Sequence, residues 1–313
     1  QAVNFAAMGI LAGFQDLVVG GGIESMSRPA PMHVDGFTAN NHHLRDQYDM
    51  VAQGVSADLI ASVEGFTREQ CDQLAVDSQA RAQAAIAEGR FEKALVPIYD
   101  DDGSLALDHD EFTRPGTTLE SLAKLTPSFE KMGAAVLPDR KLTIDETALL
   151  AYPHLSEIRH VHHAGNSSGV VDGASAVLVT SPAYAQAHGM TPRARIVMSA
   201  VAGTEPVIML TAPGPAAIRC MEKAGMTLDD IDLIEVNEAF ASVVLKFLRD
   251  TGADWEKCNV NGGAMALGHP IGATGGMLIG TVLDELERRD LSTGLVTMCT
   301  GGGMGTATII ERV

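Results

Sequence analysis

The sequence predicts an α/β fold in which short apolar strands alternate with amphipathic helices. β-branched apolar runs such as Ser175–Thr180 (SAVLVT) and Ile231–Val236 end at polar residues or glycine, which is typical of strands buried on both faces. Helical patterns such as Thr67–Gly89 and Gly214–Gly225 close at a glycine, the usual residue after a helix end. The alternation of the two patterns predicts a mostly parallel sheet with helices on both sides.

The elements follow one another in three stretches. Residues 1–15 are expected to form a helix that enters the strand Asp16–Gly20. Between about Arg28 and His160 the Pro, Asp and His content rises, and we expect an excursion laid over the sheet, with a helix that opens at a Thr67-x-x-Gln70 capping box. After Ala164 the α/β rhythm returns with these expected elements: strand Ser175–Thr180, helix Pro182–Gly189, strand Ala194–Ala202, helix Gly214–Gly225, strand Ile231–Val236, helix Glu238–Asp250, helix Ala273–Arg289, and strands Leu295–Met298 and Ala307–Ile310.

Composition narrows the class of protein. The 313 residues are 46% hydrophobic with a mean hydropathy of +0.10, enough for one large or two moderate folded domains. The formal net charge of −18 makes nucleic acid and membrane surfaces poor partners. Four cysteines without CxxC or zinc spacing predict neither a disulfide framework nor a metal site. Free thiols fit a reducing compartment, so we expect a cytoplasmic protein.

Three segments place reactive side chains directly after apolar strands, where α/β proteins bind ligands. Asn237 follows strand 231–236, and its amide could hold a water or simply cap a helix. His269 lies in the Gly-rich segment Asn261–Gly275. It could serve as a neutral base, or it could be an ordinary surface His before a helix. Cys299 precedes Gly301–Gly303. It could be a thiol exposed to ligand beside oxyanion donors, or it could be a small buried hydrophobic residue.

These segments together give the chain a resemblance to the thiolase family. The segments Asn237–Phe240 (NEAF), Gly268–Gly275 (GHPIGATG) and Cys299–Gly305 (CTGGGMG) occur in the family's order. The resemblance covers essentially the whole chain. It implies a layered α/β fold of two related βαβαβ halves, with helices between and outside two sheets, and with a cover domain inserted in the first half. The expected parts are a remnant of the N-terminal half at 1–27, the cover domain with coenzyme A contacts at 28–160, the return into that half at 161–190, and the C-terminal half at 191–313.

The resemblance also implies a mechanism. His269 would deprotonate a nucleophilic cysteine, Asn237 would hold a water of the first oxyanion hole, and Cys299 would be the acid/base of the second step. The backbone N–H of Gly301 would bind the acyl-enzyme oxygen. The substrates would be acyl-CoA thioesters of fatty acid and lipid metabolism, with no permanently bound cofactor and no metal, and the protein would be a homodimer or homotetramer.

For coenzyme A, the family comparison indicates four residues. Ser168 and Ala164 would lie near the pantetheine, Phe129 beside the nucleotide end, and Arg114 near the adenine or its phosphate. Arg114 could instead form a salt bridge within its loop, and Phe129 could belong to the core of the cover domain.

The chain departs from the family pattern at its start. The nucleophilic cysteine of thiolases precedes the helix that matches Gln1–Met8, and none of the four cysteines present occupies that position. We therefore expect a sequence that is incomplete at its N-terminus and inactive alone. Ala52-Gln53 replaces the His-Met pair of short-chain thiolases, and roughly two dozen extra residues lie between Gly133 and His162. Both changes leave the acyl-chain preference open.

Two other functions stay open. A catalytically dead relative that only binds coenzyme A or lipid would also lack the nucleophile. A β-ketoacyl synthase would share the fold and the turn around His269, but such enzymes use two histidines, whereas this chain has Cys299 at the third position. That cysteine favours the thiolase reading, which is thiolysis of 3-ketoacyl-CoA or Claisen condensation of acyl-CoAs.

Overall fold

A four-stranded sheet forms the centre of the molecule. The computed structural model describes residues 1–28, 42–137 and 141–313. The strands lie in the order β7-β10-β9-β8, and their bounds are β7 Ala194–Gly203, β8 Leu233–Val236, β9 Thr293–Thr300 and β10 Met304–Arg312. Within the described part of the chain, the pair β8–β9 is parallel, whereas β10 is antiparallel to both β7 and β9. The predicted mostly parallel sheet is therefore wrong, because β9 returns into β10 through the tight turn Gly301–Gly303, which can join only antiparallel neighbours.

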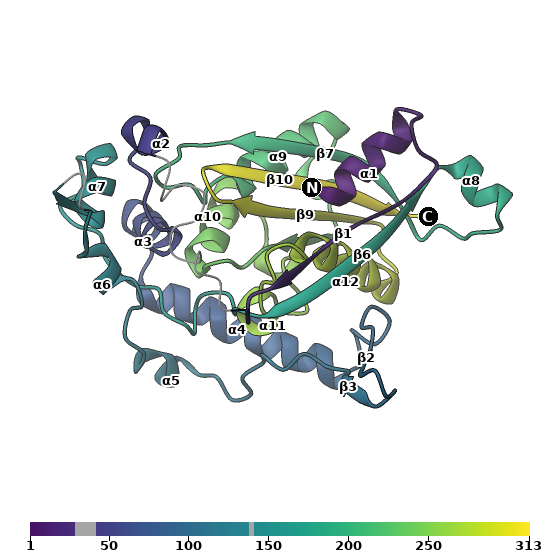
Figure 1. Cartoon of the computed structure of the whole chain (residues 1–313), viewed down its shortest axis with the longest axis horizontal. Coiled ribbons are helices and arrows are strands. Elements are labelled where there is room, and N and C mark those ends of the chain that lie inside the picture. The colour runs from purple at the N-terminus through teal and green to yellow at the C-terminus, as the bar shows by residue number, and fades with distance from the viewer. Residues whose placement is uncertain (29–41, 138–140) are drawn as a thin grey trace.

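A second sheet is a long two-stranded ribbon that runs diagonally in Figure 1, from the upper right down toward α11. It pairs β1 (Leu17–Ser25) with β6 (Asp172–Thr180) antiparallel, with Leu17 opposite Thr180 and Ser25 opposite Asp172. We call this pair the β1–β6 ribbon. The two strands are far apart in the sequence, so the chain between them is an excursion from the layered part of the fold.

Helices lie between the two sheets and outside them (Figure 1). Helix α9 (Pro213–Ala224) covers the outer face of the four-stranded sheet, and α10 (Ala241–Thr251) packs beside α9. Helix α12 (Thr274–Arg289) contacts β8 and β9 on one side and the β1–β6 ribbon on the other, and α1 (Ala2–Leu11) packs on the same ribbon. The predicted layered architecture is thereby confirmed.

Helices make up most of the regular secondary structure in the excursion between the ribbon strands. We call its described residues, 42–137 and 141–160, the cover region; 29–41 and 138–140 of the predicted cover domain lie outside the described residues. Helix α4 begins at the predicted capping box, where Thr67 Oγ1 accepts a hydrogen bond from Gln70 N. The elements are α2 His42–Gln47, α3 Gln53–Glu64, α4 Arg68–Ala87, β2 Ile98–Tyr99, β3 Leu105–Leu107, α5 Leu119–Ala123, α6 Glu130–Gly133, β4 Val136–Leu137, β5 Leu142–Thr143 and α7 Ile144–Ala151.

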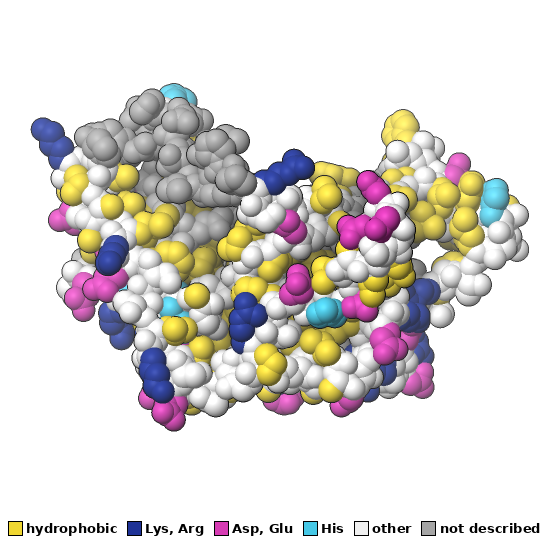
Figure 2. All heavy atoms as spheres, turned by 60° about the horizontal axis from the view of Figure 1, so that its bottom comes forward, with side chains coloured by type: hydrophobic (Ala, Val, Ile, Leu, Met, Phe, Trp, Pro, Cys, Tyr) yellow, Lys and Arg dark blue, Asp and Glu magenta, His cyan; other side chains and the backbone are white. Residues whose placement is uncertain are grey.

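The remaining elements are short. They are α8 Pro182–Ala187, the 3₁₀ turns Leu228–Asp230 and Trp255–Lys257, and α11 Ala264–Leu267. Figure 2 shows acidic, basic and apolar side chains interspersed over one face. Among the described residues, no helix has the length and apolar character needed to span a bilayer. The four-part division at 1–27, 28–160, 161–190 and 191–313 stays a prediction.

Candidate active site

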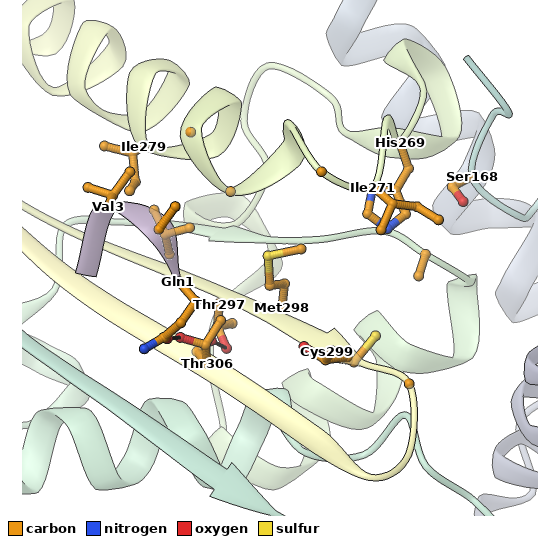
Figure 3. Close-up of a pocket in the computed structure, with 18 of the residues that line it drawn as sticks. Gln1, Val3, Ser168, His269, Ile271, Ile279, Thr297, Met298, Cys299 and Thr306 are labelled. Carbon is orange, nitrogen blue, oxygen red and sulfur yellow. Dashed lines mark hydrogen bonds between the residues drawn. The ribbon is translucent and has the colours of Figure 1, made fainter. Parts of the chain in front are cut away.

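A cavity of about 350 Å³ opens between α1, the first turn of α12 and the end of strand β9. Figure 3 shows His269 and Ser168 at one end of this cavity and Thr297, Met298 and Cys299 along β9. Its lining includes Gln53, Ser168, Phe240, His269, Cys299 and Gly301. The cavity therefore joins all three segments that the sequence singled out, through Phe240, His269 and Cys299.

His269 is held in the turn before α12. Its backbone N–H donates to Gly169 O at 2.9 Å, and its Nδ1 lies 2.6 Å from Thr274 Oγ1. Burial lowers the pKa of His269 to about 4, because an imidazolium loses its hydration inside the protein. The ring is therefore neutral near pH 7, and the cause is burial.

Asn237 approaches the other ring nitrogen of His269. It follows β8, and its backbone N–H donates to Thr297 O at 3.0 Å. Its Nδ2 lies 3.2 Å from His269 Nε2. The Asn237 side chain is 1% exposed, and its Oδ1 has no hydrogen-bond partner among the described residues. A buried acceptor of this kind can take a hydrogen bond from a water or a ligand.

Cys299 ends the buried part of β9, opposite Gly305 on β10. The residue is 8% exposed, and burial raises the pKa of its thiol to about 12. The next residues form the β9–β10 turn, in which Gly302 and Gly303 have φ of 88° and 87°, a region that strongly favours glycine. A protonated thiol beside such a turn can donate a proton to a bound ligand.

The sequence is similar to known proteins over its whole length. Residues 1–140 match the family description "Thiolase, N-terminal domain" and residues 190–312 match "Thiolase, C-terminal domain". The acetyl-CoA acetyltransferase of Allochromatium vinosum is 40% identical, over 100% of this chain and 76% of the relative. The enzyme of the same name from Escherichia coli is 38% identical over the same shares. The chain belongs to the thiolase family.

Solved thiolase structures agree with this. The acetyl-CoA acetyltransferase of Bacillus anthracis has a TM-score of 0.80 and 34% identity, and human mitochondrial 3-ketoacyl-CoA thiolase has a TM-score of 0.81 and 34% identity. Each alignment covers 100% of this chain and 76% of the other. The relatives carry the names of enzymes, so the comparisons do not support the expectation that this thiolase chain is inactive.

The four residues expected near coenzyme A do not all meet at the cavity. Ser168 lines it, whereas Ala164 is exposed outside it. Phe129 packs edge-on against Phe240, with ring centroids 5.8 Å apart, and so lies where the cover region meets the segment before α10. The guanidinium of Arg114 donates to carbonyl groups of its own loop and lies 4.8 Å from the Phe112 ring.

The lining of the thiolase cavity carries little positive charge. None of the described residues that line it is Lys or Arg, so the local basic pocket that an anionic substrate would need is not part of this lining.

Glu238 is buried behind the cavity, where its carboxylate accepts hydrogen bonds from Ser78 Oγ, Asn259 Nδ2 and Met265 N at 2.7, 2.8 and 3.1 Å. This carboxylate fixes the loop that leads to His269.

The other cysteines are separate from the cavity. Cys71, Cys220 and Cys258 are all fully buried, and burial raises the pKa of each thiol, to about 12, 11 and 12. Among the described residues, no group of three His, Cys, Asp or Glu side chains could hold a metal ion. Cys299 is thus the cysteine that the structure brings to the cavity.

Sequence reasoning missed Thr274, although this residue touches His269 directly. The available signal was its position in the first turn of the predicted helix, five residues after His269. A hydroxyl at that place in a helix faces back toward the preceding turn.

Proposed function

We propose that the protein is an acyl-CoA C-acyltransferase that performs thiolysis of 3-ketoacyl-CoA or the reverse Claisen condensation. The observation that carries the proposal is the pairing of a neutral His269 with the Asn237 amide at the edge of the cavity that Cys299 also lines. A neutral imidazole can accept a proton, and a protonated thiol can donate one, as both halves of such a transfer need.

In this proposal each residue has one role. His269 deprotonates the acyl-carrying thiol, Asn237 holds a water through its free Oδ1, Cys299 exchanges the proton of the second step, and the Gly301 amide binds the acyl oxygen. Ser168 contacts the substrate arm. The places of Ala164, Phe129 and Arg114 along coenzyme A stay predictions, since none of the three lines the cavity.

Cys299 has the proton-transfer role in this proposal, because the other three cysteines are fully buried and do not line the cavity. The protein is further proposed to act as a homodimer or homotetramer, which sedimentation would test.

The test is a thiolysis assay of the full protein with 3-ketoacyl-CoA substrates of increasing acyl length and free coenzyme A. The His269→Ala variant should lose on the order of 10²–10⁴-fold in kcat, as expected for loss of an acid/base group. His109→Ala is the matched control, because His109 is exposed on the cover region, and it should keep wild-type activity. Near-normal turnover of His269→Ala would refute the proposed mechanism.

A wild-type protein that binds acyl-CoA without turnover would support a binding relative instead. Decarboxylation of a malonyl thioester without thiolysis would support a β-ketoacyl synthase. Both probes belong in the same experiment, because the three outcomes exclude one another.

A further inference from the structure

The hydroxyl of Thr274 lies between the His269 ring and the backbone of the preceding turn. Its Oγ1 is 2.6 Å from His269 Nδ1 and 2.9 Å from Pro270 O. Thr274 is 2% exposed, so water does not compete for these bonds. The hydroxyl therefore has two fixed partners.

The number of protons decides the direction of both bonds. A hydroxyl has one proton and can accept through its lone pairs, whereas a backbone carbonyl can only accept. Thr274 Oγ1 must then donate to Pro270 O and accept from His269 Nδ1. Consequently the proton of the neutral ring lies on Nδ1, and Nε2 keeps its lone pair.

The contact at the second ring nitrogen fits the same tautomer. The amide of Asn237 lies 3.2 Å from Nε2 through its Nδ2, which can only donate. A donor at this place requires an unprotonated Nε2, the same tautomer that Thr274 imposes. Two partners on opposite sides of the ring thus agree.

We propose that Thr274 is a positioning residue, which holds His269 in the Nδ1–H tautomer so that Nε2 is the proton acceptor for the reaction. This inference rests on the proposed function for its kinetic consequence, but the tautomer itself does not depend on turnover. When Nε2 takes the proton of a thiol, the S–H bond breaks, its electron pair stays on sulfur, and an N–H bond forms. Nδ1–H keeps its bond to Thr274 Oγ1 throughout.

A hydroxyl that bonds the carbonyl four residues earlier is common in helices and often has no further role. Replacement by Val separates a hydroxyl of that kind from one that positions His269, because Val keeps the shape of Thr274 and removes the hydrogen-bond acceptor. In Thr274→Val the Nδ1–H of His269 has no partner, and the ring can change to the tautomer that carries its proton on Nε2. Thr274→Ser is the matched control, because it keeps the hydroxyl and loses only a methyl group.

The experiment measures kcat and KM of the two variants in the full protein, together with ¹⁵N NMR of labelled histidine. Thr274→Val should lose about 10- to 100-fold in kcat, within the range of acid/base effects, with KM changed by less than about threefold. Thr274→Ser should stay within about threefold of the wild type in both constants. The NMR spectrum should show protonated Nδ1 and unprotonated Nε2 for His269 in the wild type and in Thr274→Ser, and a shift toward protonated Nε2 in Thr274→Val.

Wild-type protein with the proton on Nε2 would overturn the inference, whatever the activity. Full kcat in Thr274→Val would also overturn it. A wild-type protein that lacks thiolysis but shows protonated Nδ1 would support the tautomer assignment while the proposed function fails, so the two failures are distinguishable.

Discussion

The thiol of Cys299 is buried but lies against a cavity, and this combination has a chemical consequence. Burial raises its pKa to about 12, so the reactive thiolate is a small fraction at neutral pH. We predict that iodoacetamide modifies Cys299 slowly at pH 7, and that the rate rises about tenfold for each pH unit up to pH 10. Peptide mapping by mass spectrometry would give the rate at each pH.

The other cysteines are the internal controls for this measurement. Cys71, Cys220 and Cys258 are each 0% exposed and do not line the cavity, so they should react only when the protein unfolds. Modification of Cys299 at pH 7 as fast as that of a free thiol would show that its pKa is not raised.

At the residue scale, the sequence could predict side chains that directly follow buried strands. Asn237 and Cys299 are of this kind, since strand ends on one sheet edge are brought together by the fold. Phe129 and Arg114 lie in irregular segments, where packing decides side-chain direction. A Cβ on Gly54, for example, would lie 2.2 Å from the Phe129 ring, and the sequence around either residue does not predict that contact.

At the scale of elements, the β1–β6 ribbon braces the turn that carries His269. Glu24 accepts a hydrogen bond from Gly272 N at 3.1 Å, and Ser175 Oγ donates to Ala273 O at 2.6 Å. The closest approach is backbone to backbone, because a Cβ on Gly22 would lie 1.9 Å from Gly272 O. The ribbon and the turn therefore have to move together.

We predict that Gly22→Ala displaces this turn. The variant should lose about 3 kcal/mol of unfolding free energy, as overpacking does, and on the order of 10²-fold in kcat, as a misplaced catalytic group does. Gly280→Ala in α12 is the matched control, because a Cβ there meets nothing within 4 Å and should add about 0.5–1 kcal/mol of stability. Urea denaturation measures the unfolding free energy of each variant, and thiolysis assays measure its kcat. Equal values for the two variants would contradict the bracing role.

Helices could be predicted from the sequence better than strand pairing. The Thr67 capping box is a local signal, and the start of α4 that it predicted is confirmed. The direction of pairing depends on contacts between distant segments, as between Leu17 and Thr180. The turn at 301–303 could have indicated an antiparallel return, but its glycines suited a ligand-binding loop equally well.

At the scale of the whole molecule, hydrogen bonds around Asp58 hold the cover region together and extend through His162 to α10 of the layered part. His160 lies between two carboxylates, with Nδ1 2.7 Å from Asp58 on α3 and Nε2 3.0 Å from Asp145 on α7. His162, two residues further along the chain, donates from Nδ1 to Asp58 at 2.7 Å and accepts from Ser242 N of α10 at 3.3 Å. One chain of contacts thus links α7, α3 and α10.

We predict that this linkage weakens in alkali. Burial would lower the pKa of His160, but hydrogen bonds to Asp145 and Asp58 outweigh it and raise the pKa to about 9. The folded state therefore holds this proton more tightly than the unfolded chain, whose histidine titrates near 6.5. The stabilisation is fully present below pH 6.5, falls as the pH rises, and is lost above about pH 9. It amounts to about 2 kcal/mol after allowance for the partly exposed Asp145.

Urea denaturation of the wild type and of His160→Gln between pH 6 and 10 measures this contribution as the difference between the two free energies of unfolding. The difference should be largest at pH 6 and should shrink steadily toward pH 10, because both proteins share every other titrating group. His154→Gln is the control, since His154 is exposed on the same cover region, and its difference from the wild type should stay near zero at each pH. A difference for His160→Gln that does not change with pH would mean that the proton on His160 does not hold α7 to α3.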